Sequence, residues 1–157
     1  MSTVKTAPRA AGYDRDFHDW AESQARALRG RQSTALDWDN LAEEIESLGR
    51  SDQREVTSRL TTLLVHLLKW RYQPDLRTES WSDTIARERI ELPLIFEQSP
   101  SLARFAEATF AKAYRLARKE AARQTHLDLP AFPADPPFSL GESLEPDLWP
   151  EAEGGTE

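Results

Sequence analysis

The sequence predicts an all-α, single-domain bundle of about five helices with an extended, proline-rich C-terminal arm. Three observations support this fold class. Apolar residues recur at spacings of three and four through residues 13–127. Capping residues, glycines and prolines divide that stretch into segments of helix length. Residues 128–150 then mix prolines with Phe and Leu, which indicates an extended segment that still packs on the bundle. No strand, internal repeat or glycine-rich phosphate loop is expected.

The composition limits the classes of function. The chain has 157 residues, no cysteine and a net charge of −7, which argues against a general nucleic-acid coat protein. Disulfides and thiolate chemistry are excluded, and a cytoplasmic location is expected. No apolar run approaches the ~20 residues that span a bilayer, so no membrane association is expected. No cofactor is expected either.

Two helices are expected in the first third of the chain, after a disordered leader over residues 1–12. Asp14 is a suitable N-cap for the first, which Gly30 ends. The second begins at Asp37 and ends or kinks at Gly49. Its apolar stripe consists of Leu41, Ile45 and Leu48.

Three longer helices are expected to follow. The third, residues 51–73, is the predicted central element and ends before Pro74. The fourth, from a capping box at Ser80 to residue 98, contains Pro93, which should kink it. The fifth starts at Ser99-Pro100 and reaches about residue 124. The predicted inward face of the third helix consists of Val56, Leu60, Leu63, Leu64, Leu67 and Trp70. That of the fifth helix consists of Leu102, Phe105, Ala106, Thr109, Ala113, Leu116 and Ala117.

The C-terminal arm, residues 128–150, is expected to be fixed to the bundle by Phe132, Phe138 and Trp149. Residues 151–157 are expected to be a disordered acidic end. Residues 128–157 contain eight acids and no Lys or Arg, so the acidity of the chain belongs to its C-terminal end. The five tryptophans fall one per element, which is typical of core residues; they are Trp20, Trp38, Trp70, Trp81 and Trp149.

Several motifs resemble a known family. They are YDRDFHDW (13–20), LDWDNLAEEIESLGRSDQRE (36–55), SRLTTLLVHLLKWRYQPD (58–75), SPSL (99–102) and FPADPPFSLGESLEPDLWP (132–150). Over roughly residues 13–150 the chain resembles the bacterial family catalogued as domain of unknown function 29. The resemblance implies an all-helical bacterial protein and supplies no activity. The chain departs from the family at His18, where Tyr is usual, and at Pro93, in a helix that is usually uninterrupted.

Arg59 and His66 are the candidate catalytic residues. They are seven positions apart on the third helix, so they lie about 20° from each other on one side of it. The pair resembles the Arg-x4–6-His signature of ribonucleases in the higher eukaryotes and prokaryotes nucleotide-binding superfamily. In such a site Arg59 would bind the scissile phosphate and His66 would act as general acid or base. Alternatively, His66 makes a structural hydrogen bond to a buried carboxylate or carbonyl group. Trp70, Arg71 and Tyr72 are candidates for a binding cleft beside this pair.

Two charged clusters suggest further hypotheses. Glu43 and Glu46 are one turn apart and, with His66, could hold a divalent cation, although the Glu-x-x-His signature of di-iron bundles is absent and no metal is favoured. The alternative is that these carboxylates pair with nearby arginines. A basic stripe on the fifth helix could bind nucleic acid or pair with the acidic arm; it consists of Lys112, Arg115, Arg118, Lys119 and Arg123.

Three functions follow from these observations. The leading prediction is a protein-interaction module that binds another protein or itself, such as one partner of a toxin–antitoxin-like or defence-linked pair. The alternatives are a metal-independent ribonuclease using Arg59 and His66, and a small metal-binding protein. An interaction module should carry an exposed apolar patch of several hundred Å².

Overall fold

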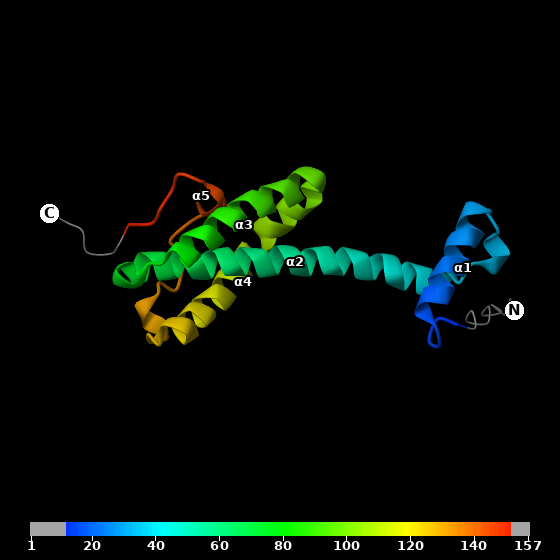
Figure 1. The fold of residues 1–157 in the computed structure, drawn as a ribbon, viewed down its shortest axis with the longest axis horizontal. Coiled ribbons are helices and arrows are strands. Elements are labelled where there is room, and N and C mark those ends of the chain that lie inside the picture. Colours follow the sequence, from blue (N-terminus) through cyan, green and yellow to red (C-terminus); the bar gives the residue numbers. More distant parts are fainter. Residues whose placement is uncertain (1–11, 152–157) are drawn as a thin grey trace, which may run out of the picture. The chain divides into compact units, whose positions relative to one another are not determined.

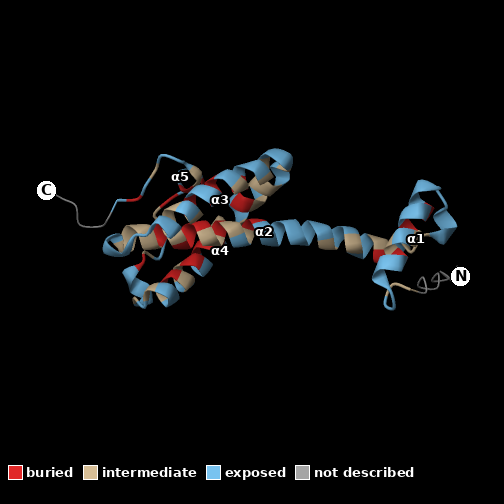
Figure 2. Cartoon of the chain, viewed as in Figure 1, coloured by how far each residue is buried: buried red, intermediate tan, exposed pale blue. Residues whose placement is uncertain are grey.

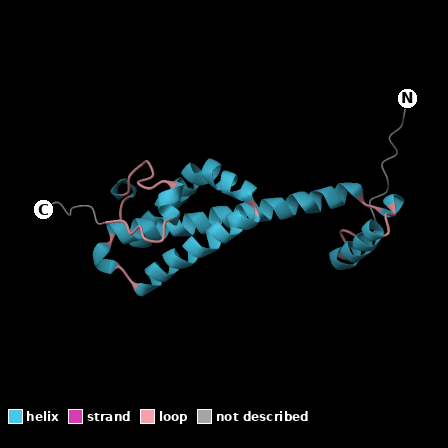
Figure 3. Cartoon of the chain, turned by 90° about the horizontal axis from the view of Figure 1, so that it is seen from above, coloured by secondary structure: helices cyan, strands magenta, loops and turns pink. Residues whose placement is uncertain are grey.

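The computed structural model describes residues 12–151, which form helices and loops and contain no strand (Figures 1 and 3). The helices are α1 (Phe17–Arg29), α2 (Trp38–Tyr72), α3 (Glu79–Gln98), α4 (Pro100–Thr125) and α5 (Leu140–Leu144). Short 3-10 turns, η1 (Ser33–Ala35), η2 (Pro74–Leu76) and η3 (Leu129–Ala131), lie in the loops. The predicted all-α class is confirmed. The expected leader and acidic end lie outside the described residues, apart from Gly12 and Glu151.

The chain divides into two compact units, with the boundary between Arg50 and Ser51. The sequence analysis treated residues 13–127 as one bundle. We call residues 12–50 the N-terminal unit and residues 51–151 the C-terminal unit, and describe each by itself. Among residues 12–151, no helix has the length and apolar character needed to cross a membrane.

The two helices expected on either side of Gly49 are one continuous helix, α2, of 35 residues. The prediction that Gly49 ends or kinks a helix was therefore wrong. A glycine in a helix interior costs only about 1 kcal/mol relative to alanine, and no proline follows to stop the chain. The fifth helix of the structure is instead α5, which the sequence analysis placed within an extended arm.

The N-terminal unit is held by polar contacts around one buried tryptophan. Trp20 is buried, and its indole Nε1 donates to Asp37 Oδ2 at 3.2 Å. The buried amide of Gln24 donates to the Ala35 carbonyl oxygen and accepts from the Asp37 amide at 2.8 Å. These bonds fix the loop between α1 and α2. The N-cap of α1 is Asp16, not the predicted Asp14, because its carboxylate accepts from the Asp19 amide.

The C-terminal unit has an extensive apolar core. In Figure 2 the buried residues of α2 are concentrated in its second half. All five predicted aliphatic residues of that half are fully buried, and Val65 and Leu68 are buried as well. They cluster with Ile85 and Leu92 of α3 and with the buried face of α4, which consists of Ala106, Ala113, Tyr114, Ala117 and Ala121. Because α2 is apolar on several sides here, α3, α4 and the arm all pack against it.

Some predicted core residues are exposed. Leu116 on α4 is exposed, whereas Ala117, also predicted to face inward, is buried; Tyr114, which was not predicted, is buried as well. Trp38 is 62% exposed, so the prediction that every tryptophan is a core residue was wrong.

The N-cap of α3 is Thr78, two residues before the predicted Ser80, and α3 continues through Pro93 to Gln98.

The C-terminal arm is fastened by apolar side chains and by one buried arginine. Phe132 and Phe138 are buried, and the ring of Trp149 lies 4.7 Å from that of Trp70. Arg89 of α3 donates to the carbonyl oxygens of Ser143 at 2.9 Å, Pro146 at 3.4 Å and Leu148 at 2.7 Å. Since burial of a guanidinium requires hydrogen-bond acceptors, the arm and Arg89 stabilise each other.

We expect Gly49→Ala to raise the free energy of unfolding by about 0.5 to 1 kcal/mol, because Gly49 lies inside α2 and an added Cβ would meet no atom within 4 Å. Urea unfolding followed by circular dichroism measures this. A glycine that ended a helix in a left-handed conformation would give the opposite sign, so a loss of stability would contradict the continuous helix. Gly141→Ala, in the short helix α5, provides a comparison.

Candidate functional site

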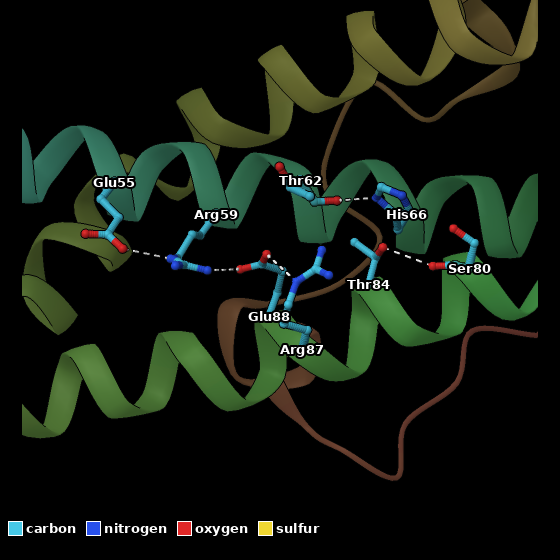
Figure 4. A network of polar contacts seen from close by, with 8 residues as sticks. All are labelled: Glu55, Arg59, Thr62, His66, Ser80, Thr84, Arg87 and Glu88. Carbon is cyan, nitrogen blue, oxygen red and sulfur yellow. Dashed lines mark hydrogen bonds and ion pairs between the residues drawn. The ribbon is translucent and has the colours of Figure 1, made fainter.

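The candidate catalytic Arg59 lies in an ion-pair cluster between α2 and α3 (Figure 4). Its Nη1 donates to Glu88 Oε2 at 3.2 Å, and its Nε donates to Glu55 Oε1 at 3.0 Å. The Glu88 carboxylate is buried, and its Oε1 also forms an ion pair with Arg87 Nε at 3.7 Å. The cluster therefore supplies the cations that a buried carboxylate requires.

His66 lies one turn further along α2 than Thr62 and is half-buried. Its Nδ1 is 2.8 Å from the Thr62 carbonyl oxygen, so in the neutral ring Nδ1–H donates and Nε2 is an acceptor. Burial lowers the pKa of His66, and the positive charges of Lys69 and Arg87 act in the same direction. The predicted structural alternative, a hydrogen bond from His66 to a carbonyl group, describes this geometry.

The cluster limits what Arg59 can do chemically. Hydrogen bonds to Glu55 and then Glu88 raise the pKa of Arg59, and both carboxylates already occupy the guanidinium. A hollow of about 310 Å³ lies here, lined by Glu55, Ser58, Arg59, Thr62 and Glu88. A phosphate entering it would meet two carboxylates and would have to displace one of them. His66 does not line this hollow, so the structure joins Arg59 to Glu88 and not to His66.

The three predicted cleft residues lie at the end of α2, where Trp70 and Tyr72 contact the arm. The ring of Trp70 lies 4.7 Å from that of Trp149 at an interplanar angle of 49°, and the Arg77 guanidinium lies 4.7 Å from the centre of the Trp70 ring. Tyr72 packs edge-on against Phe132 at 5.4 Å, and the guanidinium of Arg71 lies 5.5 Å from the Tyr72 ring. These aromatic rings bind the arm of the same chain.

The acidic cluster pairs within the chain, and the basic stripe does so in part. Glu43 and Glu46 both pair with Arg50, at 2.8 and 3.7 Å, as the alternative to a metal site predicts. Over residues 12–151, no group of three His, Asp or Glu side chains is placed to hold a metal ion. In the basic stripe, Arg118 donates to the Phe132 carbonyl oxygen of the arm and Arg123 pairs with Glu120. Lys112, Arg115 and Lys119 are exposed.

The sequence analysis missed an apolar groove in the N-terminal unit. It has a volume of about 270 Å³ and is lined almost entirely by apolar side chains of α1 and α2. We call it the α1–α2 groove. The most exposed of its large residues are Phe17 (50%), Leu28 (51%), Ile45 (68%) and Leu48 (69%). The sequence does contain an apolar helical stripe at this groove, formed by Leu41, Ile45 and Leu48. Such a stripe does not indicate whether another part of the chain covers it.

The chain matches the model of the family described as Domain of unknown function DUF29 over residues 13–149. Because the match covers most of its length, the chain belongs to this family, as the motifs predicted. No curated protein and no solved structure shows significant similarity to it.

We expect Arg59→Met to lower the free energy of unfolding by about 2 kcal/mol, because the buried Glu88 carboxylate loses its closest cation. The double variant Arg59→Met with Glu88→Met should lose less than the sum of the two single changes, which a double-mutant cycle in urea measures. Strict additivity would contradict the pairing. A catalytic Arg59 would instead give a stable Arg59→Met variant that has lost cleavage of RNA.

We expect the chain to lose stability as the pH falls through 6.5, in part because of His66. The unfolded histidine binds a proton near that usual pKa, whereas burial keeps the pKa of the folded residue lower. Unfolding free energies at pH 7.5 and 5.5 should therefore differ less in His66→Asn, whose amide can still donate to the Thr62 carbonyl oxygen. Titration of the carboxylates is common to both proteins and cancels in the comparison. Equal pH dependence would show that the His66 ring is accessible to protons in the folded chain.

Proposed function

We propose that this member of the Domain of unknown function DUF29 family is a protein-interaction module. Its N-terminal unit docks an amphipathic helix in the α1–α2 groove. The observation that carries the proposal is the exposure of four large apolar side chains, Phe17, Leu28, Ile45 and Leu48, around one groove. Water contact with such a patch is unfavourable, and soluble proteins that keep one use it to bind a partner.

The weak core of the N-terminal unit supports the proposal. Of its apolar residues only Trp20 and Ala27 are buried, alongside the polar Gln24 and Asn40. Two helices with so little buried apolar area gain little stability from packing on each other. A third helix seated on Ile45 and Leu48 would supply the missing contacts.

The shape and lining of the groove favour a helix as the ligand. Leu41, Ile45 and Leu48 follow the i, i+4, i+7 spacing of a helix-packing face. The groove offers little polar surface, apart from Gln24 and Glu44, and both of these already have hydrogen-bond partners. A small polar metabolite would find few groups to bind, whereas an apolar helix face would pack well.

The wider setting belongs to the same proposal. A small module with one apolar docking face suits a dedicated pair, such as a toxin with its antitoxin or two components of a defence system. A cytoplasmic bacterial setting agrees with the absence of cysteine. The ribonuclease alternative has less support, because Arg59 is already bound by two carboxylates.

We expect a photo-crosslinking amino acid at Leu48 to form an adduct in cells that produce the chain natively, because a bound partner would cover this position. Ile45→Glu in the same chain should remove the adduct, since a buried carboxylate without a cation opposes docking. Leu116→Glu is the matched control, because Leu116 is an exposed leucine of α4 in the other unit. Adduct yield is read on a denaturing gel and the adduct mass by mass spectrometry.

No adduct at Leu48, or an adduct that Ile45→Glu and Leu116→Glu reduce equally, would overturn the proposed docking face. Both variants should fold as the wild type does, because each changes an exposed side chain.

A further inference from the structure

We infer that the exposed face of α4 binds the phosphate backbone of double-stranded DNA without selecting a base sequence. This activity is separate from the proposed docking, because α4 lies in the C-terminal unit and the α1–α2 groove lies in the N-terminal unit. Two properties of α4 point to it. Its outward cations are gathered on one side of the helix, and most of them have no partner in the described chain.

The cations of α4 lie on the side of the helix that faces away from the core. Between Pro100 and Thr125 the chain carries six Lys and Arg residues and only two acids, Glu107 and Glu120. At 3.6 residues per turn, five of the cations fall within a sector of about 100°, and both acids fall outside it. The sector lies on the side opposite the buried Ala113 and Ala117. We call it the α4 basic face; it consists of Arg104, Lys112, Arg115, Lys119 and Arg123.

Most of the α4 basic face is available to an anion. All five cations are exposed, and within residues 12–151 only Arg123 among them forms an ion pair. The acidic arm does not neutralise them. Over the same residues, the only hydrogen bonds from a cation of α4 to the arm come from Arg118, which lies outside the face and donates to the Phe132 carbonyl oxygen. Four cations of the face are therefore open to a ligand.

The net charge of −7 does not argue against this local surface. Residues 128–157 hold eight of the acids and none of the bases, so the excess of acid belongs to the C-terminal end and not to α4. An anionic ligand responds to the local field of a surface as well as to the total charge. Arg115 and Lys119 are four residues apart, and their like charges repel each other along the helix. An anion bound across them would remove that repulsion.

The residues around the cations favour a regular polyanion over a protein or a membrane. The exposed residues between Arg104 and Lys112 include the small Ala108 and Ala111, which allow close approach and offer no large apolar anchor for a protein partner. A membrane-bound helix inserts its apolar side into the lipid, whereas the apolar side of α4 is buried in the core. Phosphates need only cations within reach, which this face supplies.

The same residues favour duplex DNA among the nucleic acids. Single strands are bound by stacking their bases on aromatic rings, and the aromatic residues of α4, Phe105, Phe110 and Tyr114, pack on the core. Proteins that bind double-stranded RNA contact its 2′-hydroxyl groups, and alanines are poor partners for them. Along the DNA axis each strand has a phosphate about every 3.4 Å. The four open cations extend over about 22 Å of α4, so several phosphates lie within their reach.

The salt dependence of binding gives a sharp test in the full chain. With about four phosphate contacts, the logarithm of the binding constant should fall with the logarithm of salt concentration at a slope of about −3 to −4. Lys112→Gln with Lys119→Gln should weaken binding at low salt at least roughly tenfold and make the slope shallower by about 2. Fluorescence anisotropy of labelled DNA duplexes of two unrelated sequences measures both quantities, and the two sequences should bind equally.

Arg26→Gln with Arg29→Gln is the matched control. It also removes two exposed cations, from α1 in the other unit, so the net charge of the chain changes by the same amount. Glutamine has nearly the helix propensity of lysine and arginine, so both variants should remain folded, which circular dichroism checks. The control should bind DNA as the wild type does.

Several outcomes would overturn the assignment of DNA to the α4 basic face. They are a wild type that does not bind DNA at low salt, an α4 variant that binds as the wild type does, and a control that loses as much as the α4 variant. Tighter binding to an RNA duplex, to polyglutamate or to phosphatidylserine vesicles would assign the face to another ligand. None of these results affects the adduct at Leu48, so the docking proposal stands or falls separately.

Discussion

The burial of the second half of α2 is the constraint on which the C-terminal unit depends. Between Val56 and Leu68, seven apolar residues of this helix are buried, and they do not lie on one face. A helix that is apolar on several sides must be covered on several sides. Helices α3 and α4 cover part of it, and the arm supplies the rest through Phe132, Phe138 and Leu140. The arm is thus a wall of the core, which explains why it is apolar despite its prolines and its acidic charge.

The same constraint explains where the conspicuous polar residues lie. Arg89 and Glu88 are adjacent on α3 and both are buried, yet they serve different contacts. Arg89 holds three carbonyl oxygens of the arm, and Glu88 accepts from Arg59 of α2. Trp70 and Tyr72, which the sequence marked as a possible cleft, pack against Trp149 and Phe132. Polar and aromatic groups at the edges of this core fasten the elements that cover it.

The sequence predicted the features that depend on local pattern, such as the buried face of a helix. It did not predict the features that depend on contacts between distant residues. It placed the inward face of α2 correctly from Val56 to Leu67, because helical periodicity marks a buried face. The sequence analysis wrongly divided α2 at Gly49. A glycine marks a helix end only when the residues after it leave the helical conformation, and here they continue the helix. It put Arg59 and His66 on one side of α2, but Glu88, 29 residues from Arg59 and on another helix, determines what Arg59 binds. No spacing rule within α2 contains that partner.

The stripe of Leu41, Ile45 and Leu48 shows again that helical spacing alone does not determine whether a face is buried. Its spacing is as regular as that of Val56, Leu60 and Leu63, and yet the first stripe is largely exposed and the second is buried. Both lie on one helix, so helix propensity and register cannot account for the difference. What differs is whether the chain supplies a covering element. Residues 51–151 provide α3, α4 and the arm, whereas residues 12–50 provide only α1. An apolar face that the described chain does not cover is a surface on which a binding partner can gain stability by excluding water.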